Sequence, residues 1–243
     1  MTSPDRWWEA AFGAHYRTVY AHRDDDAATR EAAFAAGALG IVRRALVLDA
    51  GCGDGRHARA LAATGASVVG ADRSTALLAP ALALGGGPRF VAAEFRALPF
   101  RDACFAHVVS FFTSFGYFDD AGNAAHLRSL RRVVRAGGGL LLDFLNAPRV
   151  ATTLVPETTR RLGERTIVEH RAIRRGRVEK DVEVLGGGEG PLAWRESVRL
   201  YDRDEVESML RAARFGVRAV HGDLAGAVWS PASERLVVIG AAA

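Results

Sequence analysis

Residues 46–55 read LVLDAGCGDG, an apolar run that ends in an acid and three alternating glycines, and the helix-favouring segment 56–62 follows at once. A buried strand that turns sharply into a helix needs positions with positive φ and no Cβ. Glycine meets both demands and lets a ligand approach the backbone. This stretch therefore predicts a strand, a tight loop and a helix, with a flat polar ligand against the loop.

A second apolar run, residues 67–71 (SVVGA), ends at Asp72, 23 positions after Asp49. An acid at the end of the second strand of a βαβ unit suits a ribose, because a carboxylate can accept hydrogen bonds from both hydroxyls. The usual dinucleotide loop spaces its glycines as Gly-x-Gly-x-x-Gly. Here the glycines alternate and position 56 is not glycine, which argues against NAD.

Five segments occur in an order shared with one enzyme family: 46–55, 68–72, 90–100 (FVAAEFRALPF), 107–118 (HVVSFFTSFGYF) and 130–144 (LRRVVRAGGGLLLDF). They resemble the class I S-adenosylmethionine-dependent methyltransferases, in particular the small-molecule and N-methyltransferase-like branch. The resemblance implies an α/β fold, a Rossmann-like doubly wound sheet of seven mostly parallel strands. It also implies S-adenosyl-L-methionine as cofactor, S-adenosyl-L-homocysteine as its product, and no metal.

Beyond these segments, the sequence predicts a helical start and a β-rich insertion. Residues 157–184 alternate apolar with charged side chains across Arg175-Gly176-Arg177, which predicts an antiparallel hairpin, and 194–201 predict a further strand. We therefore expect an N-terminal helical lid and a small antiparallel β insertion after the fifth strand. We interpret the chain as a single methyltransferase domain (1–243), made of the lid (1–40), the cofactor-binding core (41–150), the β insertion (151–201) and the C-terminal helix and strands that complete the sheet (202–243).

Local residues predict where one helix begins and where another ends. Ser74 is expected to cap a helix that reaches residue 84, in which Pro80 predicts a kink or an early stop. The glycines 137–139 are expected to end a helix over 130–136, ahead of the fifth strand.

The N-terminal segment is rich in aromatic residues. Trp7, Trp8, Phe12, Tyr16 and Tyr20 recur at intervals of one, three or four, which predicts an aromatic helix face. Such a face either buries its rings against the sheet edge or closes over the cofactor as a lid. In the family that the chain resembles, Tyr or Arg from such a lid meets the methionine end of the cofactor.

The resemblance assigns the adenine of the cofactor to the end of the third strand. Glu94 stands where the family usually has Asp, which accepts a hydrogen bond from the adenine amino group, and Phe95 suits stacking on the base. Arg30 is either a ligand of the cofactor's carboxylate or an exposed helical residue. We expect the cofactor-binding residues to be Tyr16, Tyr20, Arg30, Asp49, Gly51, Cys52, Gly53, Asp72, Arg73, Glu94, Phe95, Phe111 and Thr113.

The fourth strand is expected over 107–111, and the segment that follows it should line the reaction centre, because ligands bind beyond the carboxyl ends of parallel strands. This segment has neither the Asn-Pro-Pro-Tyr of amino-group methyltransferases for DNA bases or glutamine amides nor the Pro-Cys of C5 pyrimidine enzymes. Tyr117 is the expected catalytic residue, and His126, His170 and His221 are candidate bases. We expect the acceptor pocket to include Ser114, Phe115, Asn146, Arg199 and Tyr201.

Length and composition favour a cytoplasmic enzyme. The chain has 243 residues, 49% apolar content and a net charge of +4, in which dispersed arginines largely cancel the acids. No apolar run has membrane-spanning length, and the N-terminus lacks the order of a secretory signal. Because the short arginine clusters lack interleaved aromatic residues, we expect no nucleic-acid binding. Two cysteines support neither a disulfide framework nor a metal site.

The predicted function is methyl transfer to a small-molecule acceptor, at nitrogen in the first place and with oxygen or carbon as alternatives. In-line displacement from a sulfonium mainly requires alignment and exclusion of water. The alternatives are a methyltransferase for a protein terminus or a tRNA, and a non-catalytic protein that binds S-adenosylmethionine. A monomer or homodimer is expected.

Overall fold

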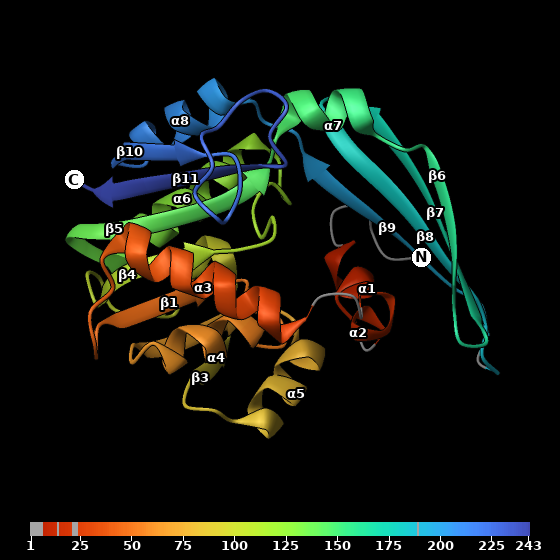
Figure 1. Ribbon diagram of the computed structural model, residues 1–243, viewed down its shortest axis with the longest axis horizontal. Coiled ribbons are helices and arrows are strands. Elements are labelled where there is room, and N and C mark those ends of the chain that lie inside the picture. Colours follow the sequence, from red (N-terminus) through yellow and green to blue (C-terminus); the bar gives the residue numbers. More distant parts are fainter. Residues whose placement is uncertain (1–6, 14, 21–23, 189) are drawn as a thin grey trace.

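β1 (Leu46–Ala50) lies near the middle of a seven-stranded sheet with the order β10-β11-β5-β4-β1-β2-β3 (Figure 1). A computed structural model describes residues 7–13, 15–20, 24–188 and 190–243. In it, β1 is parallel to β2 and β4, and β11 is antiparallel to β5 and β10. The predicted doubly wound, mostly parallel sheet is therefore confirmed. Its other strands are β2 Ser67–Asp72, β3 Arg89–Ala92, β4 Phe105–Ser110, β5 Val134–Leu145, β10 Phe215–His221 and β11 Arg235–Ala242.

Helices cover both faces of this sheet, because apolar residues of the buried strands point alternately to either side. Val47 packs in the cluster that includes α3 and α4, whereas its neighbour Leu48 packs in the cluster that includes α6 and α8. The two faces together make a three-layer α/β/α arrangement. The helices are α1 Trp8–Ala11, α2 Tyr16–Val19, α3 Asp25–Leu39, α4 Arg56–Ala63, α5 Thr75–Leu84, α6 Asp120–Val133, α7 Ala147–Thr153 and α8 Arg203–Ala212, with a 3₁₀ turn at Phe95–Ala97.

The predicted β insertion is present between α7 and α8 as a second sheet of four antiparallel strands. Its central turn is the predicted Arg175-Gly176, where both residues have positive φ (49° and 68°), as a two-residue hairpin turn requires. The strands are β6 Glu157–Leu162, β7 Arg165–Arg174, β8 Arg177–Gly186 and β9 Leu192–Arg199.

The short helices α1 and α2 lie between the core and the concave side of the insertion (Figure 1). Val19 of α2 is fully buried against Ile167, Val182 and Val184 of the second sheet. The sequence predicted one aromatic helix face here, and this is wrong in detail, because two single-turn helices carry the rings. The N-terminal segment is therefore held by the insertion on one side and by the carboxyl edge of the main sheet on the other.

Of the two helices with expected ends, the one capped by Ser74 agrees with the structure apart from the early stop at Pro80, and the one before the glycines 137–139 differs. Ser74 does cap α5, accepting a hydrogen bond from the Leu77 N–H at 3.1 Å, but the helix continues through Pro80 to Leu84. The glycines 137–139 do not end α6, which stops at Val133, and they lie inside β5. A Cβ at Gly138 would come within 2.4 Å of the Ala106 carbonyl oxygen, and one at Gly139 within 2.8 Å of the His107 Nδ1 atom, so these two glycines allow β5 to lie close to β4.

Within the described residues, no helix is both long and apolar enough to cross a membrane.

Candidate functional site

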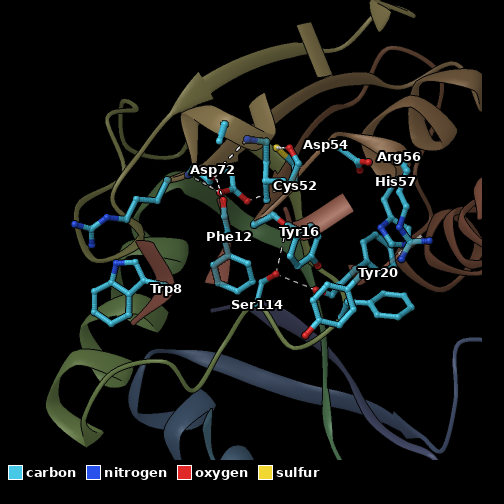
Figure 2. Close-up of a pocket in the computed structure, with 18 of the residues that line it drawn as sticks. Trp8, Phe12, Tyr16, Tyr20, Cys52, Asp54, Arg56, His57, Asp72 and Ser114 are labelled. Carbon is cyan, nitrogen blue, oxygen red and sulfur yellow. Dashed lines mark hydrogen bonds between the residues drawn. The ribbon is translucent and has the colours of Figure 1, made fainter. Parts of the chain in front are cut away.

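A cavity of about 1020 Å³ opens at the carboxyl ends of β1, β2 and β4, where parallel α/β sheets bind their ligands (Figure 2). The glycine loop after β1 forms its floor, and rings from α1 and α2 lie across it. The predicted residues that line it are Tyr16, Tyr20, Gly51, Cys52, Gly53, Asp72, Arg73, Glu94, Phe95, Phe111, Ser114 and Tyr117.

The glycine loop has the conformation that its composition predicts. Gly51, Gly53 and Gly55 have φ values of 86°, 54° and 80°, a region that side chains with a Cβ rarely adopt. A Cβ on Gly51 would lie 2.3 Å from the Ser114 Cβ, and one on Gly55 would lie 2.6 Å from the Phe90 ring. Backbone conformation therefore favours glycine at all three positions, and space requires it at Gly51 and Gly55.

Asp72 at the end of β2 holds this loop in place. Its carboxylate accepts hydrogen bonds from the backbone N–H groups of Gly53 and Ser74, each at 2.8 Å. Burial raises the pKa of Asp72, although the N–H groups of Ser74, Gly53 and Arg73 oppose the shift. The carboxylate thus joins the glycine loop to the end of the second strand and lines the cavity.

Asp49 does not line the cavity. Its side chain is buried beneath the glycine loop, and its Oδ2 atom has no hydrogen-bond partner. Burial, together with the charge of Asp72, raises the pKa of Asp49 to about 7, although Arg56 and the Ala58 N–H lower it.

We expect Asp49→Asn to stabilise the protein more at high pH than at low pH. Because the pKa of Asp49 is higher in the folded chain than in the unfolded chain, folding takes up a proton between about pH 4 and 7, and wild-type stability falls as the pH rises through this range. Asn carries no proton to lose. The gain in the free energy of unfolding should grow by up to about 1.4 kcal/mol per pH unit between pH 5 and 7, measured by urea denaturation. A gain that is constant with pH would contradict the raised pKa.

Arg73 and Glu94 form one wall of the cavity. Arg73 donates to Glu94 at 2.8 Å, lies 3.6 Å from Glu9 and covers the Trp8 ring at 5.2 Å. Burial alone would raise the pKa of Glu94, but hydrogen bonds from Arg96 and the charges of Arg96 and Arg73 lower it. The Glu94 carboxylate is therefore ionised and can accept hydrogen bonds from a ligand.

Phe95 lies beside this wall and is almost fully buried. Its ring stacks on His126 with centroids 5.1 Å apart and planes inclined by 14°. Since a second aromatic side chain supports it from behind, the Phe95 ring offers a fixed surface at the cavity.

Aromatic rings form the opposite wall. The Phe12 ring lies 5.5 Å from Tyr16 and 5.6 Å from Tyr117, and Tyr16 lies 4.7 Å from Tyr20. The backbone carbonyl of Phe12 accepts a hydrogen bond from the Ser74 hydroxyl at 2.5 Å, which joins this wall to the start of α5. Tyr117 therefore belongs to a continuous ring cluster that joins the N-terminal segment to the loop after β4.

Ser114 connects the floor to the same loop. Its hydroxyl lies 3.0 Å from the Phe111 carbonyl oxygen and 3.3 Å from that of Gly51. Both carbonyls therefore face a common point in the cavity.

Arg30 lies outside the cavity. The buried residues of α3 are Ala28, Ala32 and Ala35, which form one face of the helix, and Arg30 is exposed on another. The expected carboxylate contact therefore has no support from its position. Arg56, at the start of α4, does line the cavity and lies 3.7 Å from Glu31.

Three further predicted residues are buried elsewhere. Thr113 accepts a hydrogen bond from Arg235 at 3.0 Å, behind the loop, and Phe115 is fully buried beside Phe144. Asn146 donates to the carbonyl groups of Ser230, Pro231 and Ser233 and so holds the loop between β10 and β11 in place. Each of these side chains is engaged by packing or by the backbone, and none lines the cavity.

Arg199 and Tyr201 also lie outside the cavity, where they anchor the end of the insertion to α6. Arg199 lies 3.3 Å from Asp120, and the Tyr201 hydroxyl donates to the same carboxylate at 2.6 Å. Tyr201 accepts a hydrogen bond from Asn123 at 3.0 Å. Burial and this carboxylate raise the pKa of Tyr201.

None of the three histidines that the sequence offered as bases lines the cavity. His126 is fully buried behind Phe95, and burial lowers its pKa to about 4. His170 is exposed near Glu157, and the His221 ring contacts Phe34.

His57 does line the cavity, although no sequence pattern selects it. Its Nε2 atom lies 2.6 Å from Glu31, and its ring stacks on Phe111 at 4.2 Å. Burial lowers the pKa of His57, although Glu31 opposes the shift. Trp8, Phe12 and Arg56 are further lining residues outside the predicted set. In the part of the chain that the structure describes, no three His, Cys, Asp or Glu residues are grouped to hold a metal ion.

Comparisons with known proteins agree with this geometry. A family model described as a methyltransferase domain matches residues 47–138. A malonyl-[acyl-carrier protein] O-methyltransferase from Pseudescherichia vulneris is 40% identical over 107 residues, which make up 44% of this chain and 41% of that protein. The chain thus matches less than half the length of this relative.

Solved structures resemble the chain over nearly its whole length. The CcbJ methyltransferase from Streptomyces caelestis has a TM-score of 0.81 with 21% identity, covering 97% of this chain and 99% of that one. CalS10 from Micromonospora echinaspora, an amino pentose methyltransferase with bound S-adenosylmethionine, has a TM-score of 0.70 with 22% identity, covering 93% and 96%. Residues 47–138, which hold the glycine loop and Asp72, therefore match a methyltransferase domain, and nearly the whole chain shares its fold with solved methyltransferases.

Proposed function

We propose that the chain transfers a methyl group from S-adenosylmethionine to a nitrogen atom of a small-molecule acceptor. The observation that carries this proposal is the cavity itself, in which the glycine loop and Asp72 lie across from the ring cluster around Tyr117. Its volume of about 1020 Å³ is at the upper end of the roughly 300–1,000 Å³ of ligand pockets. A nucleoside-sized cofactor and a second small molecule have room together.

The residues of the cavity fit the cofactor. Gly51 and Gly53 leave the loop backbone open to close approach, and the Asp72 carboxylate can accept hydrogen bonds from ribose hydroxyls. Glu94 would accept from the adenine amino group, and the supported Phe95 ring would pack on the base. When bound, S-adenosylmethionine supplies an electrophilic methyl group.

The protein then has to align the acceptor and exclude water. We assign these tasks to the rings of Phe12, Tyr16 and Tyr117, and we propose that the segment of α1 and α2 acts as the lid of one domain that spans the chain. The Tyr117 hydroxyl orients the acceptor atom.

Nitrogen is favoured because a neutral amine attacks without a base, whereas a hydroxyl acceptor needs a His or carboxylate within hydrogen-bond reach. His126, His170 and His221 lie outside the cavity, and His57 is engaged by Glu31. Of the lining carboxylates, Asp72 and Glu94 are assigned to the cofactor, and Glu9 lies 3.6 Å from Arg73. The similarity to an amino pentose methyltransferase supports the same choice. Methylation of a carboxylate is the second candidate, supported by the malonyl-[acyl-carrier protein] O-methyltransferase; such an acceptor needs no base either.

The test is transfer of labelled methyl groups from S-adenosylmethionine into fractionated cell extract by the purified protein. We expect the label in acid-soluble small molecules, and we expect that mild base does not release the labelled methyl group from them. Base-labile label released as methanol would indicate a methyl ester and support the carboxylate alternative. Label in precipitated protein or RNA would contradict a small-molecule acceptor. Absence of label, together with cofactor binding by calorimetry, would indicate a non-catalytic protein.

We expect Tyr117→Phe to lower kcat with the acceptor found in that experiment by about tenfold or more, because it removes one hydroxyl that aligns the acceptor while keeping the ring. The dissociation constant for S-adenosylhomocysteine should stay within twofold of wild type. If kcat is also unchanged, Tyr117 contributes only to packing.

A further inference from the structure

We propose that Arg177 is a positioning residue that fixes the loop after β4 and thereby sets the place of Tyr117 and Phe118 in the cavity. Arg177 is the first residue of β8, so it belongs to the β insertion and lies 59 positions beyond Phe118. The inference rests on the proposed function only in that it takes Tyr117 to lie beside the acceptor.

The guanidinium of Arg177 binds three consecutive carbonyl groups of the loop. Nη1 donates to Phe118 at 2.9 Å, and Nη2 donates to Gly116 at 3.3 Å and to Tyr117 at 3.1 Å. These contacts hold the loop backbone, and the side chains of Tyr117 and Phe118 on the same loop both line the cavity.

The guanidinium is itself held by a neighbouring strand. Nε donates to the Ser197 hydroxyl at 2.7 Å, and Nη2 donates to the Ser197 carbonyl at 2.9 Å. Burial lowers the pKa of Arg177, although the charges around Tyr201 and Asp120 oppose the shift. All three nitrogens are therefore engaged between β9 and the loop, a planar arrangement that lysine cannot reproduce with its single ammonium.

The loop also fits closely against the insertion at Gly116. This residue has a φ of 85°, and a Cβ there would lie 3.0 Å from Val198 and 3.1 Å from the Arg199 carbonyl oxygen. The Arg199 N–H donates to the Gly116 carbonyl at 2.8 Å. A movement of β8 or β9 would therefore displace the loop, so the insertion can set the geometry of the acceptor side without lining it.

The test is hydrogen–deuterium exchange of the Arg177→Lys variant saturated with S-adenosylhomocysteine. Peptides that cover 112–120 should exchange about tenfold faster than in wild type, while peptides that cover the glycine loop (49–55) keep their rate. Arg174→Gln is the matched control, because Arg174 lies in the same hairpin, is 61% exposed and contacts Glu179. The peptides of the Arg174→Gln variant should exchange at the wild-type rates. Unchanged exchange at 112–120, or equal acceleration in all peptides, would overturn the proposal.

A kinetic measurement adds a readout that general destabilisation does not produce. With the acceptor found by methyl labelling, Arg177→Lys should raise the acceptor KM by about tenfold while the S-adenosylhomocysteine dissociation constant stays within twofold. An acceptor KM equal to that of wild type would overturn the proposal. If no acceptor is labelled, the proposed function fails, and hydrogen exchange still decides the role of Arg177.

Discussion

Gly51→Ala is expected to abolish measurable binding of S-adenosylhomocysteine and to lower the melting temperature by about 10 °C. Two effects combine. A φ of 86° costs a side chain with a Cβ about 1–2 kcal/mol, and the new methyl group would lie 2.3 Å from the Ser114 Cβ and 2.4 Å from its hydroxyl oxygen. Either the loop or the segment after β4 must move, and both line the cavity. Together these effects should cost about 3 kcal/mol of stability.

Two further variants separate the clash from the backbone strain. Gly163→Ala is the control for φ, because Gly163 has a φ of 59° and no heavy atom would lie within 4 Å of its Cβ. It should lose about 1 kcal/mol of stability and keep cofactor binding. The double variant Gly51→Ala with Ser114→Gly removes the clashing atoms and should recover part of the binding. Calorimetry measures cofactor binding, and thermal denaturation measures stability. If Gly51→Ala binds S-adenosylhomocysteine as tightly as wild type does, the result contradicts the close approach of the glycine loop to Ser114.

Asp72→Ala should weaken S-adenosylhomocysteine binding by about 10- to 100-fold. The variant removes the acceptor of two backbone hydrogen bonds at 2.8 Å, from Gly53 and Ser74, as well as the proposed acceptor for the ribose. Hydrogen bonds to a charged group contribute about 1.5–3 kcal/mol each, and every 1.4 kcal/mol is about tenfold in affinity.

Asp102→Ala is the matched control for Asp72→Ala. Asp102 is exposed and pairs with Arg132 at 2.7 Å, away from the cavity. Its loss should leave the dissociation constant for S-adenosylhomocysteine, measured by titration calorimetry, unchanged. If Asp72→Ala binds as well as wild type, the ribose assignment is wrong.

The main sheet could be predicted because its signals are local. The LVLDAGCGDG run fixes a strand, a loop and a helix within a few residues, and the hairpin at Arg175-Gly176 follows from alternation and a turn that tolerates positive φ. The ends of elements were less accurate where tertiary packing decided them. The glycines 137–139 predicted a helix end, yet Gly138 and Gly139 allow a close contact between β5 and β4, which no local pattern reveals.

The cofactor side of the cavity was largely predictable, whereas the acceptor side was not. Gly51 follows β1 directly, Asp72 ends β2 and Phe95 comes shortly after β3, so the topology brings them to one edge of the sheet. The partners of Arg199 and Tyr201 come from α6, far away in the sequence, and alternation along β9 shows only which residues share a face. Arg177 likewise acts on carbonyl groups 59 to 61 positions away, for which the sequence contains no signal.

We propose that the cavity between the glycine loop and the ring cluster binds the methyl donor beside the acceptor. A crystal structure of the protein with S-adenosylhomocysteine tests it most directly. We expect ribose hydroxyls within hydrogen-bond distance of Asp72, adenine against Phe95, and the sulfur facing the space beside Tyr117. A ligand bound elsewhere would show that this cavity is not the cofactor site, and a sulfur turned away from Tyr117 would show that Tyr117 does not lie beside the acceptor.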